Sequence, residues 1–269
     1  MSTNAGSQPP RLHELPASAY HRIWPSLRAL ARNTLFARAV AEQGAPGQVF
    51  AYPAESPAVV YVIHDYGMSL LYGSTGLAGV DEQLLAEVVR RPRSAAEWLQ
   101  VAPAVWAERL QGRAVERYTR VNFRFSPQAY AVCRPSPAAP EVRIVRADRT
   151  AFAMPGSVVP RLFWRDAEWF LAAGGGFGAI VDGELASLAF VSFVGDTGLE
   201  LGIETLPHHR GRGLARLACA ALIDECLARG REPVWACRLE NTASHRLAES
   251  LGFTAAHHFP YFRLPPTAC

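Results

Sequence analysis

The feature of this chain that most constrains its fold is a turn with two glycines, residues 210–213, between a strand pattern and a helix pattern. The strand pattern ends at Pro207, and the helix pattern continues to Arg229. Glycine lacks a Cβ atom, so a ligand can approach the backbone, and the first turn of a helix leaves up to about four N–H groups unpaired at the positive end of its dipole. The turn is therefore suited to a pyrophosphate, with Arg210 and Arg212 adding charge. On this pattern alone, a plain turn with solvated arginines is equally compatible.

The second half of the chain predicts a mixed, mostly antiparallel sheet flanked by helices, which is an α/β (α+β) architecture. Asp182-Gly183 is a hairpin signal between two of its strands. We expect strands at 141–148, 174–207 (three strands), 232–239 and 254–264, and helices at 160–172, 213–229 and 241–253.

The first half is less regular. A polar stripe of Tyr118, Arg120, Asn122 and Arg124 faces either solvent or an acceptor. The order of elements resembles that of the second half, which would make the first half a degenerate copy. We expect helices at 21–43, 81–91 and 94–111, the last broken at Pro103, and strands at 48–53, 58–76 and 117–127.

Composition along the chain predicts its division. Residues 1–17 are expected to form a flexible N-terminal arm, because they carry few apolar anchors. The segment 133–141 holds three prolines and predicts a linker. This division gives an N-terminal α/β domain at 18–132 and a second domain at 142–269.

The residue inventory excludes several kinds of chemistry. All 27 Lys and Arg residues are arginine, which excludes a lysine-dependent phosphate loop and a pyridoxal Schiff base. The five cysteines form no CxxC pair, so we expect no metal site and no disulfide framework. A net charge of +3 is too small for a dedicated nucleic-acid binder. With no signal peptide and no membrane span predicted, we expect a cytoplasmic protein that does not bind membranes.

The ordered set of the turn Arg210-x-x-Gly213-x-Ala215, Asn241 and the helix end LAESLGF resembles the GNAT superfamily of acyl-CoA N-acyltransferases, over about residues 141–262. The phrases LELGIETLPHHRGRGLA and PVWACRLENTASHRLAESLGF look most like the branch that contains zwittermicin-resistance acetyltransferases. The resemblance implies the GNAT fold, a first half that is a degenerate GNAT-like half or an acceptor-binding domain, and acetyl-CoA or another acyl-CoA as co-substrate.

The resemblance also implies where the coenzyme binds. Thr205 and Leu206 would lie along the thioester, and a backbone N–H near Leu206 would polarise its carbonyl. Asn241 would contact the pantetheine arm or order the site. The pyrophosphate would be bound by the backbone N–H groups of Arg210, Gly211, Arg212, Gly213, Leu214 and Ala215.

Attack of an amine on a thioester needs a base, because an alkylamine with a pKa near ~10 is mostly charged at neutral pH. The candidates are Glu200 and Glu204, which share one face of a strand. The alternative interpretation is that both are exposed strand carboxylates without a catalytic role. Ser244 is the expected proton donor for the leaving thiolate and Tyr261 the second candidate, since Ala248 stands where many relatives have Tyr. With a thiol pKa near ~8.5, a dedicated acid is dispensable.

Three functions compete at this point. The first is an acetyl-CoA-dependent N-acyltransferase acting on a small-molecule amine, as a monomer or homodimer. The second is a transferase of the same fold whose acyl donor is a carrier protein or an aminoacyl-tRNA, the one case in which a nucleic-acid partner is expected. The third is an acyl-CoA-binding module without turnover, which the missing Tyr permits.

Overall fold

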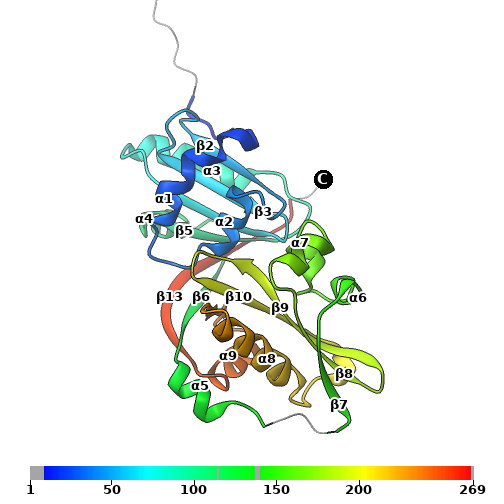
Figure 1. The fold of residues 1–269 in the computed structure, drawn as a ribbon. Helices are drawn as coiled ribbons and strands as arrows, with labels where there is room; N and C mark the ends of the chain where they lie inside the picture. Colours follow the sequence, from blue (N-terminus) through cyan, green and yellow to red (C-terminus); the bar gives the residue numbers. More distant parts are fainter. Residues whose placement is uncertain (1–8, 114, 137–139, 268–269) are drawn as a thin grey trace, which may run out of the picture.

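Figure 1 shows the computed structural model of the protein, which describes residues 9–113, 115–136 and 140–267. No helix in these ranges is long and apolar enough to cross a membrane. The first half contains β1 (His13–Glu14), the 3-10 helix η1 (Ala17–Ile23), α1 (Trp24–Arg28), α2 (Leu35–Ala41), β2 (Gly47–Tyr52), β3 (Val59–His64), β4 (Met68–Gly73), α3 (Ala78–Arg90), β5 (Glu97–Ala102), α4 (Val105–Arg109), β6 (Glu116–Phe125) and α5 (Pro127–Cys133).

The second half continues with helices and strands around the glycine turn. Its elements are β7 (Val142–Arg146), α6 (Arg149–Phe152), η2 (Pro160–Leu162), α7 (Ala167–Ala172), β8 (Gly176–Val181), β9 (Glu184–Val194), β10 (Gly198–Thr205), η3 (Pro207–His209), α8 (Leu214–Ala228), β11 (Glu232–Val234), β12 (Ala236–Arg238), α9 (Thr242–Glu249) and β13 (Phe253–Leu264).

Two sheets organise the molecule. One has five strands in the order β11-β10-β9-β8-β7, and the other has eight in the order β1-β2-β3-β4-β5-β13-β6-β12. All neighbours are antiparallel except β10 with β11 and β4 with β5. This confirms the predicted mixed, mostly antiparallel sheet flanked by helices. The long helix α8 lies across the five-stranded sheet and buries a stripe of small and aliphatic residues against it, namely Ala218, Cys219, Leu222, Ile223 and Cys226.

Strand β6 of the first half lies between β12 and β13 of the second half (Figure 1). It pairs with β13 from Glu116 to Phe125 and with β12 from Arg120 to Asn122. Strand β13 then continues along β5, from Tyr261 to Leu264. Hydrogen bonds of one sheet therefore join strands that precede the predicted linker at 133–141 to strands that follow it. Part of this linker lies outside the described residues. The division of the chain at this segment stays a prediction.

Three local expectations are wrong. Residues 97–102 form strand β5 instead of a helix, because β4 and β13 hydrogen-bond to its two edges. The helix expected at 21–43 is three short pieces, with Thr34 as the N-cap residue of α2. Of the expected flexible arm, residues 1–8 lie outside the described residues, but Leu12 and Leu15 are buried and His13 pairs with Ala51.

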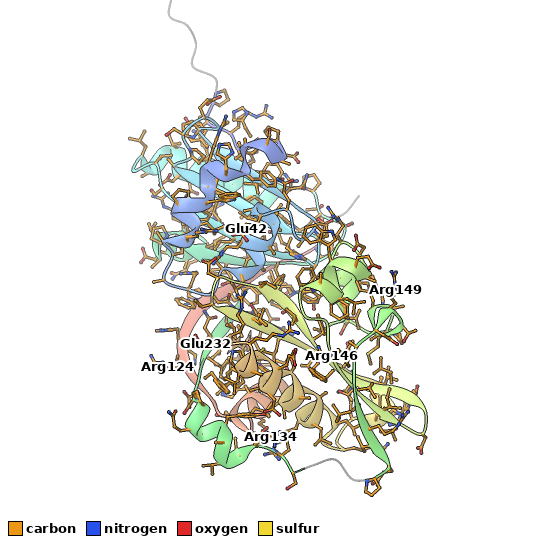
Figure 2. The ribbon with its side chains drawn as sticks, viewed as in Figure 1. Glu42, Arg124, Arg134, Arg146, Arg149 and Glu232 are labelled. Carbon is orange, nitrogen blue, oxygen red and sulfur yellow. The ribbon has the colours of Figure 1, made fainter. Side chains whose placement is uncertain are left out.

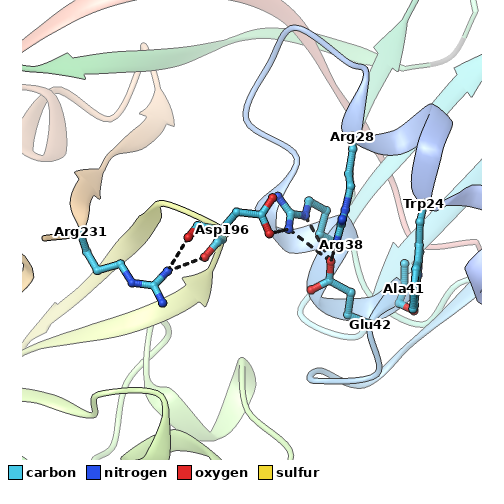
Figure 3. Close-up of polar contacts among 8 residues, drawn as sticks. Trp24, Arg28, Arg38, Ala41, Glu42, Asp196 and Arg231 are labelled. Atoms are coloured by element: carbon cyan, nitrogen blue, oxygen red, sulfur yellow. Dashed lines mark hydrogen bonds and ion pairs between the residues drawn. The ribbon is translucent and has the colours of Figure 1, made fainter. Parts of the chain in front are cut away.

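A chain of polar contacts joins α2 to the turn between β9 and β10 (Figure 3). The Arg38 guanidinium lies 2.8 Å from the carboxylate of Asp196 and also contacts Glu42. The Arg231 guanidinium donates to the backbone carbonyls of Gly195 and Asp196, at 2.9 Å each. These bonds hold the start of α2 against the second half, where the segment before α2 reaches the site described below.

Other charged side chains are exposed at the surface, among them Arg124 of β6, Arg134 after α5 and Arg146 of β7, which Figure 2 labels. Arg134 pairs with Asp224 of α8 at 2.6 Å, and Arg146 pairs with Glu225 at 3.0 Å. Exposed ion pairs of this kind each contribute little to stability. The burial of β6 is therefore expected to matter more to the fold than these pairs.

We predict that a fragment of residues 140–269 does not fold alone, because β12 and β13 would lose the strand between them. Expressed by itself, it should show no cooperative thermal transition. Expressed together with residues 1–136, it should co-purify with them and recover a single transition near that of the whole chain. A cooperative transition of the isolated fragment at a similar temperature would contradict the prediction.

Candidate functional site

The glycine turn has the geometry of an anion site. Gly211 and Gly213 have φ angles of 78° and 75°, and a Cβ atom on either would meet nothing within 4 Å. Among the described residues, no hydrogen bond occupies the backbone N–H groups from Gly211 to Ala215. These groups face a cavity of about 590 Å³, which is lined by the turn itself, by Arg216, by the end of β10 and by the start of α9.

The end of β10 is an open strand edge. It pairs with β11 only from Gly198 to Glu200, so in the described part of the chain no strand pairs with the edge from Leu201 onward on that side. The N–H of Leu206 itself donates to the Ala186 carbonyl at 2.9 Å, so an N–H near Leu206 that polarises a thioester would have to come from a neighbouring residue. Because alternate N–H groups of an antiparallel strand point to opposite sides, those of Ile203 and Thr205 point to the open edge.

Two histidines precede the glycine turn and contact one carboxylate. His208 and His209 lie in η3 and place their Nε2 atoms 3.0 and 2.9 Å from a carboxylate oxygen of Glu184. The Arg212 guanidinium donates to Nδ1 of His209 at 2.8 Å, which leaves the proton of that imidazole on Nε2, facing Glu184. The side chains of Glu184, His208 and His209 each offer a possible metal-ligand atom, and these atoms lie within 4.8 Å of one another. Arg212 opposes a metal at Nε2, since metal binding there would move the proton to Nδ1.

A second cavity, of about 380 Å³, adjoins the first. Ser157, Val158, Ile203, Asn241 and Ser244 line both, so the two cavities meet at the open edge of β10. Its walls come from both halves of the chain and are largely aromatic. They include Tyr66, Met68, Trp98 and Arg120 from the first half, and Phe163, Phe193, Glu200, Trp235, Arg238 and Tyr261 from the second.

Glu200 is the buried carboxylate of this second cavity, with 5% of its surface exposed. Its oxygens accept a hydrogen bond from the Asn33 side chain at 2.7 Å and lie 3.4 Å from the Arg120 guanidinium. Burial raises the pKa of Glu200, while Arg120 and Asn33 oppose the rise. The Glu200 carboxylate thus lines a cavity and has a raised affinity for protons, as a general base requires.

Glu204 has a structural role. Its carboxylate accepts hydrogen bonds from the backbone N–H groups of Ser157 and Val158, at 2.8 and 3.0 Å. It also lies 3.6 Å from Arg210. The two glutamates share a strand, yet only Glu200 lines the aromatic cavity.

The remaining candidates lie around the junction of the cavities. The Asn241 side chain caps α9 by accepting from the Ser244 N–H, and the Ser244 hydroxyl accepts from the Trp235 indole at 3.1 Å. Tyr261 lines the aromatic cavity, and burial raises its pKa to about 12. Ala248 is fully buried, so the position where many relatives have Tyr faces the core.

Sequence reasoning missed several residues of the site. Asn33 and Trp98 come from segments far from the turn in sequence, and Trp98 lay in a segment expected to be helical. Arg120 had one signal, its place in the polar stripe, but the stripe does not act as a unit. Asn122 is buried in the sheet and Arg124 projects outward (Figure 2).

Comparison with known proteins agrees with this geometry. A model of the GNAT acetyltransferase family matches residues 27–262. The chain belongs to this family. It is 24% identical to the uncharacterized N-acetyltransferase YdfB of Bacillus subtilis over 240 residues, which cover 84% of this chain and 89% of that protein.

Solved structures show the same fold over nearly the whole chain. A GCN5-related N-acetyltransferase-like protein from Streptococcus suis has a TM-score of 0.69 at 20% identity, covering 91% of this chain and 98% of that one. A tandem GNAT protein from the clavulanic acid biosynthesis pathway has a TM-score of 0.62 at 14% identity, covering 96% and 99%. The protein is thus an acyltransferase of a family whose members use acetyl-CoA as co-substrate.

The first half of this GNAT enzyme lacks an equivalent open site. Strands β4 and β5 stay paired from Met68 to Tyr72, so no edge opens between them. The turn after β4 is closed by the Asp81 carboxylate, which accepts from the Ser74 hydroxyl at 2.5 Å and from the Thr75 N–H at 2.9 Å. Among the residues that the structure describes, a turn with unoccupied N–H groups beside an open strand edge therefore occurs in the second half alone.

We predict that Glu204→Ala lowers the free energy of unfolding by about 1–3 kcal/mol, because it leaves the Ser157 and Val158 N–H groups without a partner. Urea unfolding measures the change. Glu184→Ala, on an exposed carboxylate, is the control and should cost less. Equal stability of Glu204→Ala and the parent protein would show that the carboxylate does not hold this loop.

Proposed function

We propose that this enzyme transfers an acyl group, most simply acetyl, from acyl-CoA to the amine of a small molecule, by direct attack on the thioester. The observation that carries the proposal is the junction of two cavities: one faces the unpaired N–H groups of the glycine turn, and the other contains buried Glu200. The resemblance to zwittermicin-resistance acetyltransferases is consistent with a small-molecule amine as acceptor.

The donor side would be bound mainly by the backbone. The N–H groups from Gly211 to Ala215 and the positive end of α8 would hold a pyrophosphate, and Arg210, Arg212 and Arg216 would add charge. The open edge of β10 would pair with the pantetheine arm. The N–H of Ile203 would then point to the thioester carbonyl and stabilise the negative charge that develops on its oxygen.

The acceptor amine would lie in the aromatic cavity beside Glu200. This carboxylate would take the ammonium proton and leave a neutral amine to attack. Ser244 lines both cavities and would be available to protonate a leaving thiolate, whereas Tyr261 lines only the acceptor side. Since the thiolate of a thiol with a pKa near ~8.5 is a good leaving group, the reaction does not require full protonation by either hydroxyl.

The donor assignment predicts that Gly213→Asp abolishes binding of acetyl-CoA. The new carboxylate would project into the cavity where the pyrophosphate is expected, and repel it. Gly76→Asp is a matched control, because Gly76 has a φ of 74° and also has nothing within 4 Å of a Cβ, but lies in the closed turn of the first half. Thermal shift with acetyl-CoA should be lost in Gly213→Asp and kept in Gly76→Asp.

The same titration separates the competing functions. If the parent protein gains no stability from acetyl-CoA yet binds an acyl carrier protein, or binds tRNA in a salt-dependent way, the free-coenzyme donor is wrong. Stabilisation by acetyl-CoA without thiol release across an amine panel would instead favour a binding module.

The base assignment predicts that Glu200→Gln lowers kcat by about 10²–10⁴-fold at neutral pH. In the parent enzyme, kcat/KM should rise with pH through the raised pKa of Glu200, because only the ionised carboxylate accepts a proton. Thiol release measured against pH reports both effects. Asn33→Ala removes a hydrogen bond that opposes the rise, and should move the acidic limb to higher pH. An unmoved limb would exclude Glu200 as its origin.

A further inference from the structure

Arg120 and Arg238 lie directly opposite each other on neighbouring antiparallel strands, β6 and β12. Their side chains emerge on the same face of the sheet, and both line the aromatic cavity. Like charges in directly opposed positions destabilise a sheet unless something compensates them. Such a pair in a cavity wall therefore needs an anion nearby.

Only one of the two arginines has its anion within the described residues. Arg120 lies 3.4 Å from the Glu200 carboxylate, with 11% of its side chain exposed. The Arg238 guanidinium stacks at 4.3 Å over the Trp98 ring and 5.6 Å from the Tyr118 ring. In the described part of the chain it forms no hydrogen bond or ion pair. The nearby Glu240 carboxylate instead accepts from the Thr119 N–H, at 3.3 Å.

Stacking on Trp98 fixes the plane of the Arg238 guanidinium and leaves its N–H groups free for a ligand. A planar guanidinium held in this way is suited to a planar carboxylate, which can accept two parallel hydrogen bonds. The charged side chains that line the cavity are Arg120, Arg238 and Glu200, with a net charge of +1. One carboxylate is enough to pair with Arg238, because Arg120 already has Glu200 as its partner.

We propose that the acceptor is an amine that also carries a carboxylate, with Arg238 binding the carboxylate and the aromatic walls binding an apolar body. This inference rests on the proposed function, because it places the acceptor amine at Glu200. Arg120 contacts Glu200 and lies opposite Arg238 in the sheet, so the positions proposed for the amine and the carboxylate are both next to Arg120. Two such neighbouring positions fit a free amino acid with a large apolar side chain, which a cavity of about 380 Å³ can accommodate.

The test compares leucine, methionine, phenylalanine, tyrosine and tryptophan with their carboxamides, which keep the amine and the body and remove the negative charge. Calorimetric titration of the full-length protein measures binding without turnover. At least one acid should bind more tightly than its amide by about 10- to 100-fold, the range of a charge-assisted hydrogen bond. Arg238→Met should remove that preference, acting on KM and hardly on kcat in a thiol-release assay.

Arg117→Met is the matched control, since Arg117 is an exposed arginine of β6 that does not line the cavity, and the variant has the same change in net charge. It should keep the preference for the acid. The inference is overturned if no acid binds, if acids and amides bind equally, or if Arg238→Met weakens both alike. Thiol release with any amine separately tests the proposed function. Acetylation of the amides alone would therefore support the acyltransferase activity and contradict a carboxylate site at Arg238.

Discussion

The pairing of β6 with both β12 and β13 is the constraint on which the site depends. It gives the second half a strand that its own sequence lacks, and it places Arg120 opposite Arg238. Through β13 it also brings β5 alongside, so that Trp98 reaches Arg238. The acceptor cavity therefore belongs to neither half, and its polar groups are positioned by backbone hydrogen bonds of the sheet.

The donor side depends on the opposite condition, an unpaired strand edge. A strand edge in a folded protein is normally covered or paired. Here β10 leaves β11 after Glu200, and the bulge at Glu200/Leu201 in its pairing with β9 coincides with that separation. Buried Glu200 and the open edge are thus consecutive on one strand, so the proposed proton acceptor and the proposed thioester site would keep a fixed relation.

The sequence was most informative where a local pattern has a local cause. The glycine turn, the Asp182-Gly183 hairpin and the helix α8 each follow from a few neighbouring residues, and all appear as expected. Glu200 could be named as a candidate but not separated from Glu204, because the difference comes from Asn33 and Ser157, which reach the strand from elsewhere. Strand β5 was mistaken for a helix because its two neighbours, distant in sequence, override its spacing. The hydrogen bond from the Leu206 N–H to Ala186 could not be foreseen, because it depends on the register of the strands.

The closed turn of the first half has a wider meaning. A turn with unpaired N–H groups is less stable when no anion accepts hydrogen bonds from them. In the first half the Asp81 carboxylate supplies a permanent negative charge at that place. Burial raises the pKa of Asp81, but the hydrogen bonds from Ser74 and Thr75 lower it by more. The net effect is a lowered pKa, so the carboxylate stays ionised. A single acidic side chain can in this way accept the hydrogen bonds that a bound anion would otherwise accept, so that the turn has a structural role.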